Sequence, residues 1–161
     1  MLLASKIQSG EDCIAPDTPQ TPLRFIDARD MAEWVCNNVD HMRGIINLPG
    51  PLLQFGQFLE VIKLELNSRS RVVWMDEAFL LNNKVQPWLE IPLWLPKDLQ
   101  NFFTINDAKA LAGGLSYRPL SQTILDTAQW LQSSSPNFKI VTGLDGKKEC
   151  ELLATFKAGL S

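Results

Sequence analysis

The sequence predicts a mixed α/β fold built on a parallel-strand crossover unit, and three features of residues 23–51 support this prediction. Two short apolar runs, 24–28 and 44–48, have the length and composition of strands. The Pro-Gly-Pro at 49–51 ends the second run. Two strands joined by an amphipathic helix form the right-handed unit of a parallel sheet, which needs further strands beside it. The apolar residues between the runs recur at helical spacing and form one stripe: Met31, Trp34, Val35, Val39 and Met42.

The helix of this unit is expected to begin at Asp30. The Asp30 carboxylate can accept hydrogen bonds from the first turn, and Glu33 can reach back to the N–H of the cap. Asp76 is expected to cap a short helix over residues 77–82 in the same way. A hydrolase using Asp76 and Glu77 is therefore a remote alternative, because sequence neighbours on a helix do not face each other.

The remaining elements follow from local patterns. Apolar spacing predicts the clearest helix of the chain over residues 54–67. Strands are expected at 71–75 and 102–105, where β-branched and aromatic residues gather, and prolines make residues 1–22 largely a loop. Three further helices are expected: one capped by Asn106 or Asp107 and ended by Gly113-Gly114, one from Pro119 to about Gln132, and one capped by Asp145.

Residues 85–96, VQPWLEIPLWLP, form a proline-rich loop. Its three prolines forbid a regular helix, and its large apolar side chains must cover a core, line a pocket or contact a partner. Pockets are often aromatic-lined and built on loops, so Trp88 and Trp94 are candidate pocket residues. Trp34 and Trp130 lie on predicted helices and are expected to pack in the core.

Composition excludes several function classes. The 161 residues suit one domain, and a net charge of −3 gives no electrostatic support for nucleic acid or an anionic membrane surface. No apolar run approaches the ~20 residues that a membrane helix needs. The three cysteines match no metal spacing or disulfide framework, which favours the cytoplasm. His41, the only histidine, lies on a polar turn and is expected at the surface rather than in a catalytic triad.

Three stretches taken together resemble a known family: FIDARDMAEWV (25–35), INLPGP (46–51) and GLSYRPLSQTILDTAQWL (114–131). Their order and spacing are similar to the C-terminal part of the NAD-dependent epimerase/dehydratase family, the extended short-chain dehydrogenases/reductases. The segment VVWMDEAFLL with PLWLP is closest to a reductase-like bacterial branch, and the resemblance runs from about Gly10 to Leu160. The residues that match the family pattern are Phe25, Ile26, Asp30, Met31, Ala32, Asn47, Gly50, Pro51, Asp126, Thr127 and Trp130.

The resemblance implies a partial Rossmann-like unit, with few parallel strands and crossover helices, plus a small α/β substrate-side subdomain. Residues 1–132 would form the substrate-side part, and 133–161 a linker and C-terminal helix. Substrate contacts are expected from Trp88, Trp94 and Arg24. Sugar-nucleotide members often carry an arginine where this chain has Leu23. A one-residue offset along a strand turns the Arg24 side chain to the opposite face, which counts against a nucleotide-sugar substrate.

The family's GxxGxxG loop and Tyr-x-x-x-Lys pair are absent from this sequence. Its one tyrosine, Tyr117, is followed four residues later by Ser121. We therefore assign no catalytic, cofactor-binding or metal-binding residue and expect no cofactor on this chain alone, although the resemblance implies NAD(P) for the complete family enzyme.

Two functions stay open. The first is the substrate-binding portion of an NAD(P)-dependent epimerase, dehydratase or reductase, which would bind a small-molecule substrate beside a dinucleotide-binding half. The second is a non-catalytic remnant that associates, for example as a homo-oligomer, through an uncovered apolar face.

Overall fold

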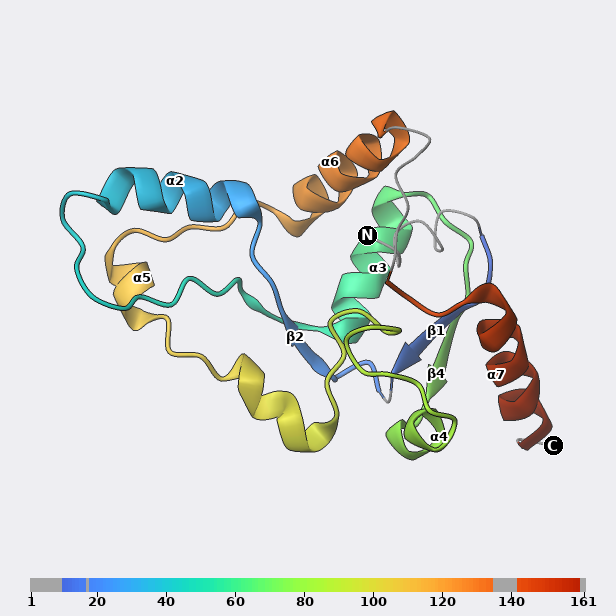
Figure 1. The fold of residues 1–161 in the computed structure, drawn as a ribbon. Helices are drawn as coiled ribbons and strands as arrows, with labels where there is room; N and C mark the ends of the chain where they lie inside the picture. The colour runs from blue at the N-terminus through green and yellow to red at the C-terminus, as the bar shows by residue number, and fades with distance from the viewer. Residues whose placement is uncertain (1–9, 17, 135–141, 160–161) are drawn as a thin grey trace.

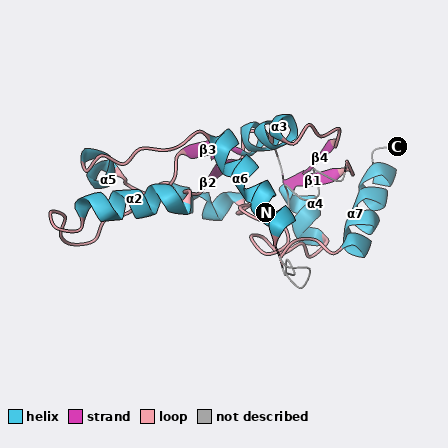
Figure 2. Ribbon diagram, turned by 90° about the horizontal axis from the view of Figure 1, so that it is seen from above, coloured by secondary structure: helices cyan, strands magenta, loops and turns pink. Residues whose placement is uncertain are grey.

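The computed structural model describes residues 10–16, 18–134 and 142–159, and it confirms a mixed α/β fold with a small parallel sheet (Figures 1 and 2). The elements in chain order are β1 (Cys13–Pro16), β2 (Pro22–Arg24), α2 (Ala28–Asn38), β3 (Leu52–Gln54), α3 (Phe55–Glu65), β4 (Val72–Met75), α4 (Glu77–Asn82), the 3₁₀ helix η1 (Lys97–Phe103), α5 (Ala108–Ala112), α6 (Leu120–Ser133) and α7 (Gly146–Gly159).

The parallel pair consists of β1 and β4, aligned so that Cys13 lies opposite Val72 and Pro16 opposite Met75. The predicted strand 71–75 is thus confirmed as β4. Its partner was not predicted, because β1 lies in the segment whose prolines indicate a loop. All four β1 residues are buried, and β1 and β4 lie beside α4 and α7 in Figure 1.

The crossover unit predicted over residues 24–48 is wrong. β2 ends at Arg24, where the predicted strand begins, and pairs antiparallel with β3. Residues 44–48 form no strand. Asp27, rather than Asp30, caps α2: its carboxylate accepts a hydrogen bond from the Arg29 N–H at 2.9 Å. The helix therefore begins at Ala28 and leaves no room for the strand.

The main core surrounds the β1–β4 pair. The predicted helix 54–67 is confirmed as α3, and its apolar side places Phe55, Phe58, Leu59 and Ile62 in this core. Ile124 of α6 and Leu152 of α7 are buried in the same cluster. The C-terminal helix, beyond the predicted boundary at residue 132, therefore shares a core with the preceding part of the chain.

A second, smaller hydrophobic cluster lies between α2, α5 and the segment 44–51. We call this region the α2–α5 arm (Figure 1). Trp34, Ala110 and Leu115 are its buried residues. Of the apolar stripe predicted on α2, Trp34 alone is fully buried. Met31, Val35 and Val39 lie on the exposed side, at 38%, 45% and 64% exposure.

The other predicted helices are confirmed as α4, α5, α6 and α7. Asp76 caps α4 by accepting from the Phe79 N–H at 2.8 Å, and Asp145 accepts from the first turn of α7. The strand predicted at 102–105 is wrong, because residues 97–103 form η1 directly after Pro96. Residues 85–96 are irregular as predicted, and Trp88 and Leu93 adopt positive φ there, at 64° and 69°.

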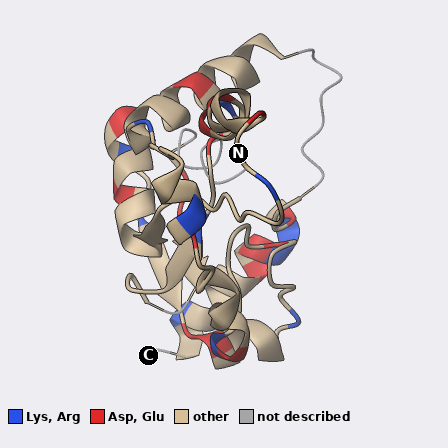
Figure 3. Ribbon diagram, turned by 90° about the vertical axis from the view of Figure 1, so that its left-hand side faces the viewer, with Lys and Arg blue, Asp and Glu red and all other residues tan. Residues whose placement is uncertain are grey.

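Charged residues of both signs are interspersed along the chain in the view of Figure 3. Within the described part of the chain, every helix is too short or too polar to cross a bilayer.

Candidate functional site

A cavity with a volume of about 730 Å³ lies against α6. Its walls come from three parts of the chain: residues 25–29, which join β2 to α2; Phe58 of α3 with Pro92 and Leu93 of the proline-rich loop; and residues 123–130 of α6. Most of the lining atoms are apolar. The volume lies in the range of about 300–1,000 Å³ typical of small-molecule sites. We call this space the α6 cavity.

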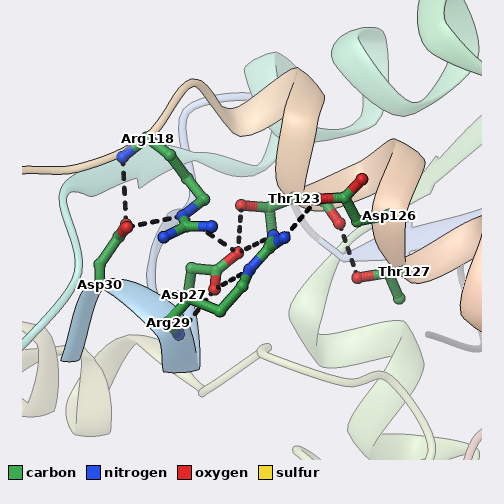
Figure 4. Close-up of polar contacts among 7 residues, drawn as sticks. All are labelled: Asp27, Arg29, Asp30, Arg118, Thr123, Asp126 and Thr127. Carbon is green, nitrogen blue, oxygen red and sulfur yellow. Dashed lines mark hydrogen bonds and ion pairs between the residues drawn. The ribbon is translucent and has the colours of Figure 1, made fainter. Parts of the chain in front are cut away.

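One end of the α6 cavity is charged (Figure 4). The Arg29 guanidinium donates to both Asp27 oxygens, from Nε at 3.0 Å and from Nη2 at 2.7 Å, and also pairs with Asp126 of α6. The Thr123 hydroxyl donates to Asp27 Oδ2 at 2.8 Å. These contacts join the start of α2 to α6 and leave Asp126 half-exposed at the rim.

Behind this end, Asp30 and Arg118 form a more buried pair. Arg118 donates to the Asp30 carboxylate from Nε at 2.6 Å and from its backbone N–H at 3.1 Å. The Asp30 side chain is 7% exposed and the Arg118 side chain 18%. Asp30, predicted as a helix cap, thus fixes the segment that leads into α6.

The pairing of Asp27 with Arg29 favours the charged form of both groups. The hydrogen bonds from Arg29 hold the pKa of the Asp27 carboxyl well below its usual range, aided by Thr123 and Arg118 and opposed by desolvation. Reciprocally, the hydrogen bonds to Asp27 and Asp126 raise the pKa of Arg29 above its ordinary value. The network therefore holds three carboxylates against two guanidiniums and has one net negative charge.

Neither predicted tryptophan of the proline-rich loop lines the α6 cavity. Trp94 is fully buried in the main core, and of the described residues it has the one buried side-chain nitrogen or oxygen without a hydrogen-bond partner. Trp88 is 45% exposed and packs edge-on against Phe102 at a centroid distance of 6.1 Å. The loop instead reaches the cavity through Pro92 and Leu93. Trp130, expected in the core, is 47% exposed and lines the cavity.

Arg24, the third predicted substrate-binding residue, connects segments of the fold. Its guanidinium donates to the carbonyls of Gly50 at 2.6 Å, Phe103 at 3.2 Å and Ile105 at 3.0 Å, and pairs with Asp107. It lines a separate hollow of about 130 Å³. The structure thus does not bring Arg24, Trp88 and Trp94 together in one site, and their role in substrate binding stays a prediction.

The two acidic residues considered for a hydrolase, Asp76 and Glu77, each accept a hydrogen bond from the backbone. Asp76 caps α4, and Glu77 accepts from the Lys97 N–H at 2.8 Å. His41 is exposed, as predicted. Among the described residues, no group of three or more His, Cys, Asp and Glu side chains is placed to hold a metal ion.

The sequence matches no family model, and a search of curated proteins gave no match. The family resemblance therefore stays a prediction from the motif residues.

Five of the eleven motif residues line the α6 cavity. Phe25 and Ile26 from the first motif line it together with Asp126, Thr127 and Trp130 from the third. The middle motif joins the third through the Tyr117 hydroxyl, which donates to the Pro49 carbonyl at 3.0 Å.

Sequence reasoning missed Asp27, Arg29, Arg118 and Thr123 as site residues. One signal was available: Asp27 and Asp30 are both acidic at the start of one helix, where a single cap suffices, so a second carboxylate is free for another partner. As it stands, the arrangement can bind a largely apolar small molecule and present a carboxylate to its polar end.

Proposed function

We propose that this chain is the substrate-binding portion of an NAD(P)-dependent epimerase, dehydratase or reductase-type oxidoreductase. The observation that supports the proposal is the convergence of two family-like motifs, about ninety residues apart, on a single large apolar cavity. In this role the α6 cavity would hold the substrate, with Pro92 and Leu93 of the proline-rich loop as one wall. Cys13, Cys36 and Cys150 form no disulfide among the described residues, which suits action in the cytosol.

The described residues do not fit a dinucleotide. The sequence has no GxxGxxG loop, and the start of α2 at the cavity is already satisfied by the Asp27 carboxylate. An anionic pyrophosphate placed there would meet that carboxylate. We therefore assign the nicotinamide site to a dinucleotide-binding half that pairs with this chain.

Tyr117 does not fit the role of a catalytic tyrosine. Burial raises the pKa of its phenol, with Asp107 acting in the same direction, whereas catalysis by a tyrosinate needs a lowered pKa. Its hydroxyl donates to Pro49, and the residue four positions later is Ser121 rather than lysine. The chain alone is therefore expected to be inactive.

Two measurements test this proposal. NADH and NADPH titrated into the purified chain should give no saturable change in tryptophan fluorescence or cofactor emission. The DNA immediately upstream should encode a GxxGxxG…Tyr-x-x-x-Lys segment, and that polypeptide mixed with this chain should oxidise NADPH in the presence of a carbonyl substrate. Tight cofactor binding by the chain alone, or turnover without the second polypeptide, would contradict the proposal.

A second function, association through an apolar face, is supported by an exposed stripe formed by Met31 and Val35 of α2 and by Val39 at the C-cap of this helix. Their spacing places all three on one side of the helix, and contiguous exposed apolar surface favours protein contacts. Sedimentation velocity decides this point: the association proposal requires a concentration-dependent increase in sedimentation coefficient, and a monomer at all concentrations excludes self-association.

A further inference from the structure

The α6 cavity combines an aromatic interior with a rim that carries negative charge. Phe25, Phe58 and Trp130 present rings from three different elements, and Leu93 and Ile124 add aliphatic surface. Trp130 is 47% exposed and lines the cavity, so part of its side-chain surface faces this space. Surfaces of this kind bind apolar bodies, and aromatic rings contribute most of the contact area.

Among the described residues, Arg29 is the cation that lines the cavity, and it is already paired with acids. Each of the three Arg29 nitrogens has a carboxylate partner, Nε and Nη2 with Asp27 and Nη1 with Asp126. An anionic ligand would therefore have to displace a carboxylate or lie beside two of them. Arg118, the other nearby guanidinium, is held by Asp30 and Asp27.

Asp126 offers the open hydrogen-bonding capacity at this rim. Its Oδ2 accepts from Arg29, while Oδ1 has no hydrogen-bond partner among the described residues, and its side chain is 42% exposed. A carboxylate oxygen only accepts hydrogen bonds, so it selects ligands with a hydroxyl or ammonium donor.

We infer that the α6 cavity binds a small molecule with an apolar, preferably aromatic, body and a hydroxyl or ammonium group, and that it discriminates against phosphate and carboxylate ligands. As a statement about substrate, this inference rests on the proposed function and narrows it to uncharged or cationic alcohols and their carbonyl partners. Nucleotide sugars, which bear two phosphates, are excluded as substrates.

The test uses the 161-residue chain and probes that share one body. Isothermal titration at low salt compares 4-phenyl-2-butanol, 4-phenylbutylamine, 4-phenylbutanoate and UDP-glucose. The alcohol and the amine should bind at least about tenfold more tightly than the carboxylate, because a nearby like charge disfavours the anion. UDP-glucose should not bind. Equal or tighter binding of the carboxylate or UDP-glucose, or no binding of any probe, would overturn the inference.

Three single-residue variants test whether the probes bind in the α6 cavity. Trp130→Ala should weaken the alcohol and the amine by about tenfold through lost ring contact. Leu125→Ala is the matched control, since Leu125 lies on the same helix at a similar exposure, 44%, but does not line the cavity, and it should leave both affinities unchanged. Asp126→Asn should reduce the preference for the amine over the carboxylate several-fold, because it removes the charge at the rim. An equal loss for Trp130→Ala and Leu125→Ala, or an unchanged preference in Asp126→Asn, would contradict the assignment.

The outcomes separate this inference from the proposed function. If the chain and its dinucleotide-binding half reduce a carboxylated or phosphorylated substrate, the function stands and the ligand inference fails. If the probes bind with the stated preference but no nicotinamide-dependent turnover appears with the second polypeptide, the ligand inference stands and the proposed function fails.

Discussion

The region around β1 and β4 and the α2–α5 arm are stabilised in different ways. The first encloses its apolar side chains between strands and helices, with Phe55, Leu59 and Met75 fully buried. The arm buries Trp34, Ala110 and Leu115 and leaves a stripe of α2 exposed.

Directed polar contacts hold the arm in place. Trp34 Nε1 donates to the Ala110 carbonyl at 2.9 Å, and Asn38 donates to the Gly113 carbonyl at 3.0 Å. Arg24 connects three backbone carbonyls and Asp107 near the base of the arm. Burial should therefore decide global stability, and these contacts should decide whether the arm stays docked.

The largest effect is expected for Phe55→Ala in the main core. It removes a fully buried ring and should lower the free energy of unfolding by about 3–5 kcal/mol, measured by urea denaturation. Leu64→Ala, on the same helix but 77% exposed, is the control and should stay within about 0.5 kcal/mol. Similar losses in both variants would show that burial in α3 does not govern stability.

Arg24→Met should separate the two regions. The change leaves three carbonyls and Asp107 without their donor and should cost roughly 3 kcal/mol. Hydrogen exchange should accelerate in α2 and α5 before it does in β1 and β4. Arg71→Met removes a surface ion pair with Asp12 and should cost less than about 1 kcal/mol. If hydrogen exchange accelerated equally in all elements of the chain, the α2–α5 arm would not open independently.

Asp27→Asn should weaken the junction between α2 and α6 in a pH-dependent way. The pKa of Asp27 is lowered in the folded chain, so its charged form stabilises the fold above the unfolded pKa of about 3.9. The variant should lose roughly 2 kcal/mol at pH 7. The deficit should shrink as the pH falls below about 4, because the carboxyl of the unfolded wild type then binds a proton while that of the folded chain still resists protonation. Denaturation at several pH values measures this, with the exposed Asp40→Asn as control. A deficit that is constant with pH would contradict a charge-based role.

The smallest effect on stability is expected for Val35→Lys on the exposed side of α2. Val35 is 45% exposed, so the free energy of unfolding should change by no more than about 0.5 kcal/mol. If the stripe mediates association, the same variant should sediment as a monomer where the wild type does not. Leu81→Lys, at 42% exposure on α4, controls for added charge and should leave association unchanged.

The elements that sequence could predict are those specified by neighbours in the chain. In α3 the apolar spacing is complete, and in α4 the capping Asp76 carboxylate and the N–H that donates to it lie within one turn, so local pattern suffices. β1 could not be predicted, because its pairing with β4 and its burial depend on a segment nearly sixty residues later. Likewise, Asp27 and Asp30 are equivalent as caps until Arg118, 88 residues away, binds Asp30.

The distinction between local sequence pattern and contacts of distant segments also applies to the candidate site. Asp126 and Trp130 lie in a motif that the sequence singles out, although Trp130 was expected in the core, whereas the wall formed by Pro92 and Leu93 depends on how the proline-rich loop folds. Trp88 and Trp94 were chosen for residue type and loop position, and neither property fixes the direction of a side chain.

The three cysteines differ in exposure, so their reactivity can report when β1 and β4 separate. Cys13 lies within β1 at 1% exposure, whereas Cys36 and Cys150 are exposed on α2 and α7. A thiol reagent should therefore modify two sulfurs at once and the third only when the parallel strands separate. The rate at which Cys13 is modified would then measure how often the two strands separate, without an engineered label. A ligand that stabilises the folded state would lower this rate.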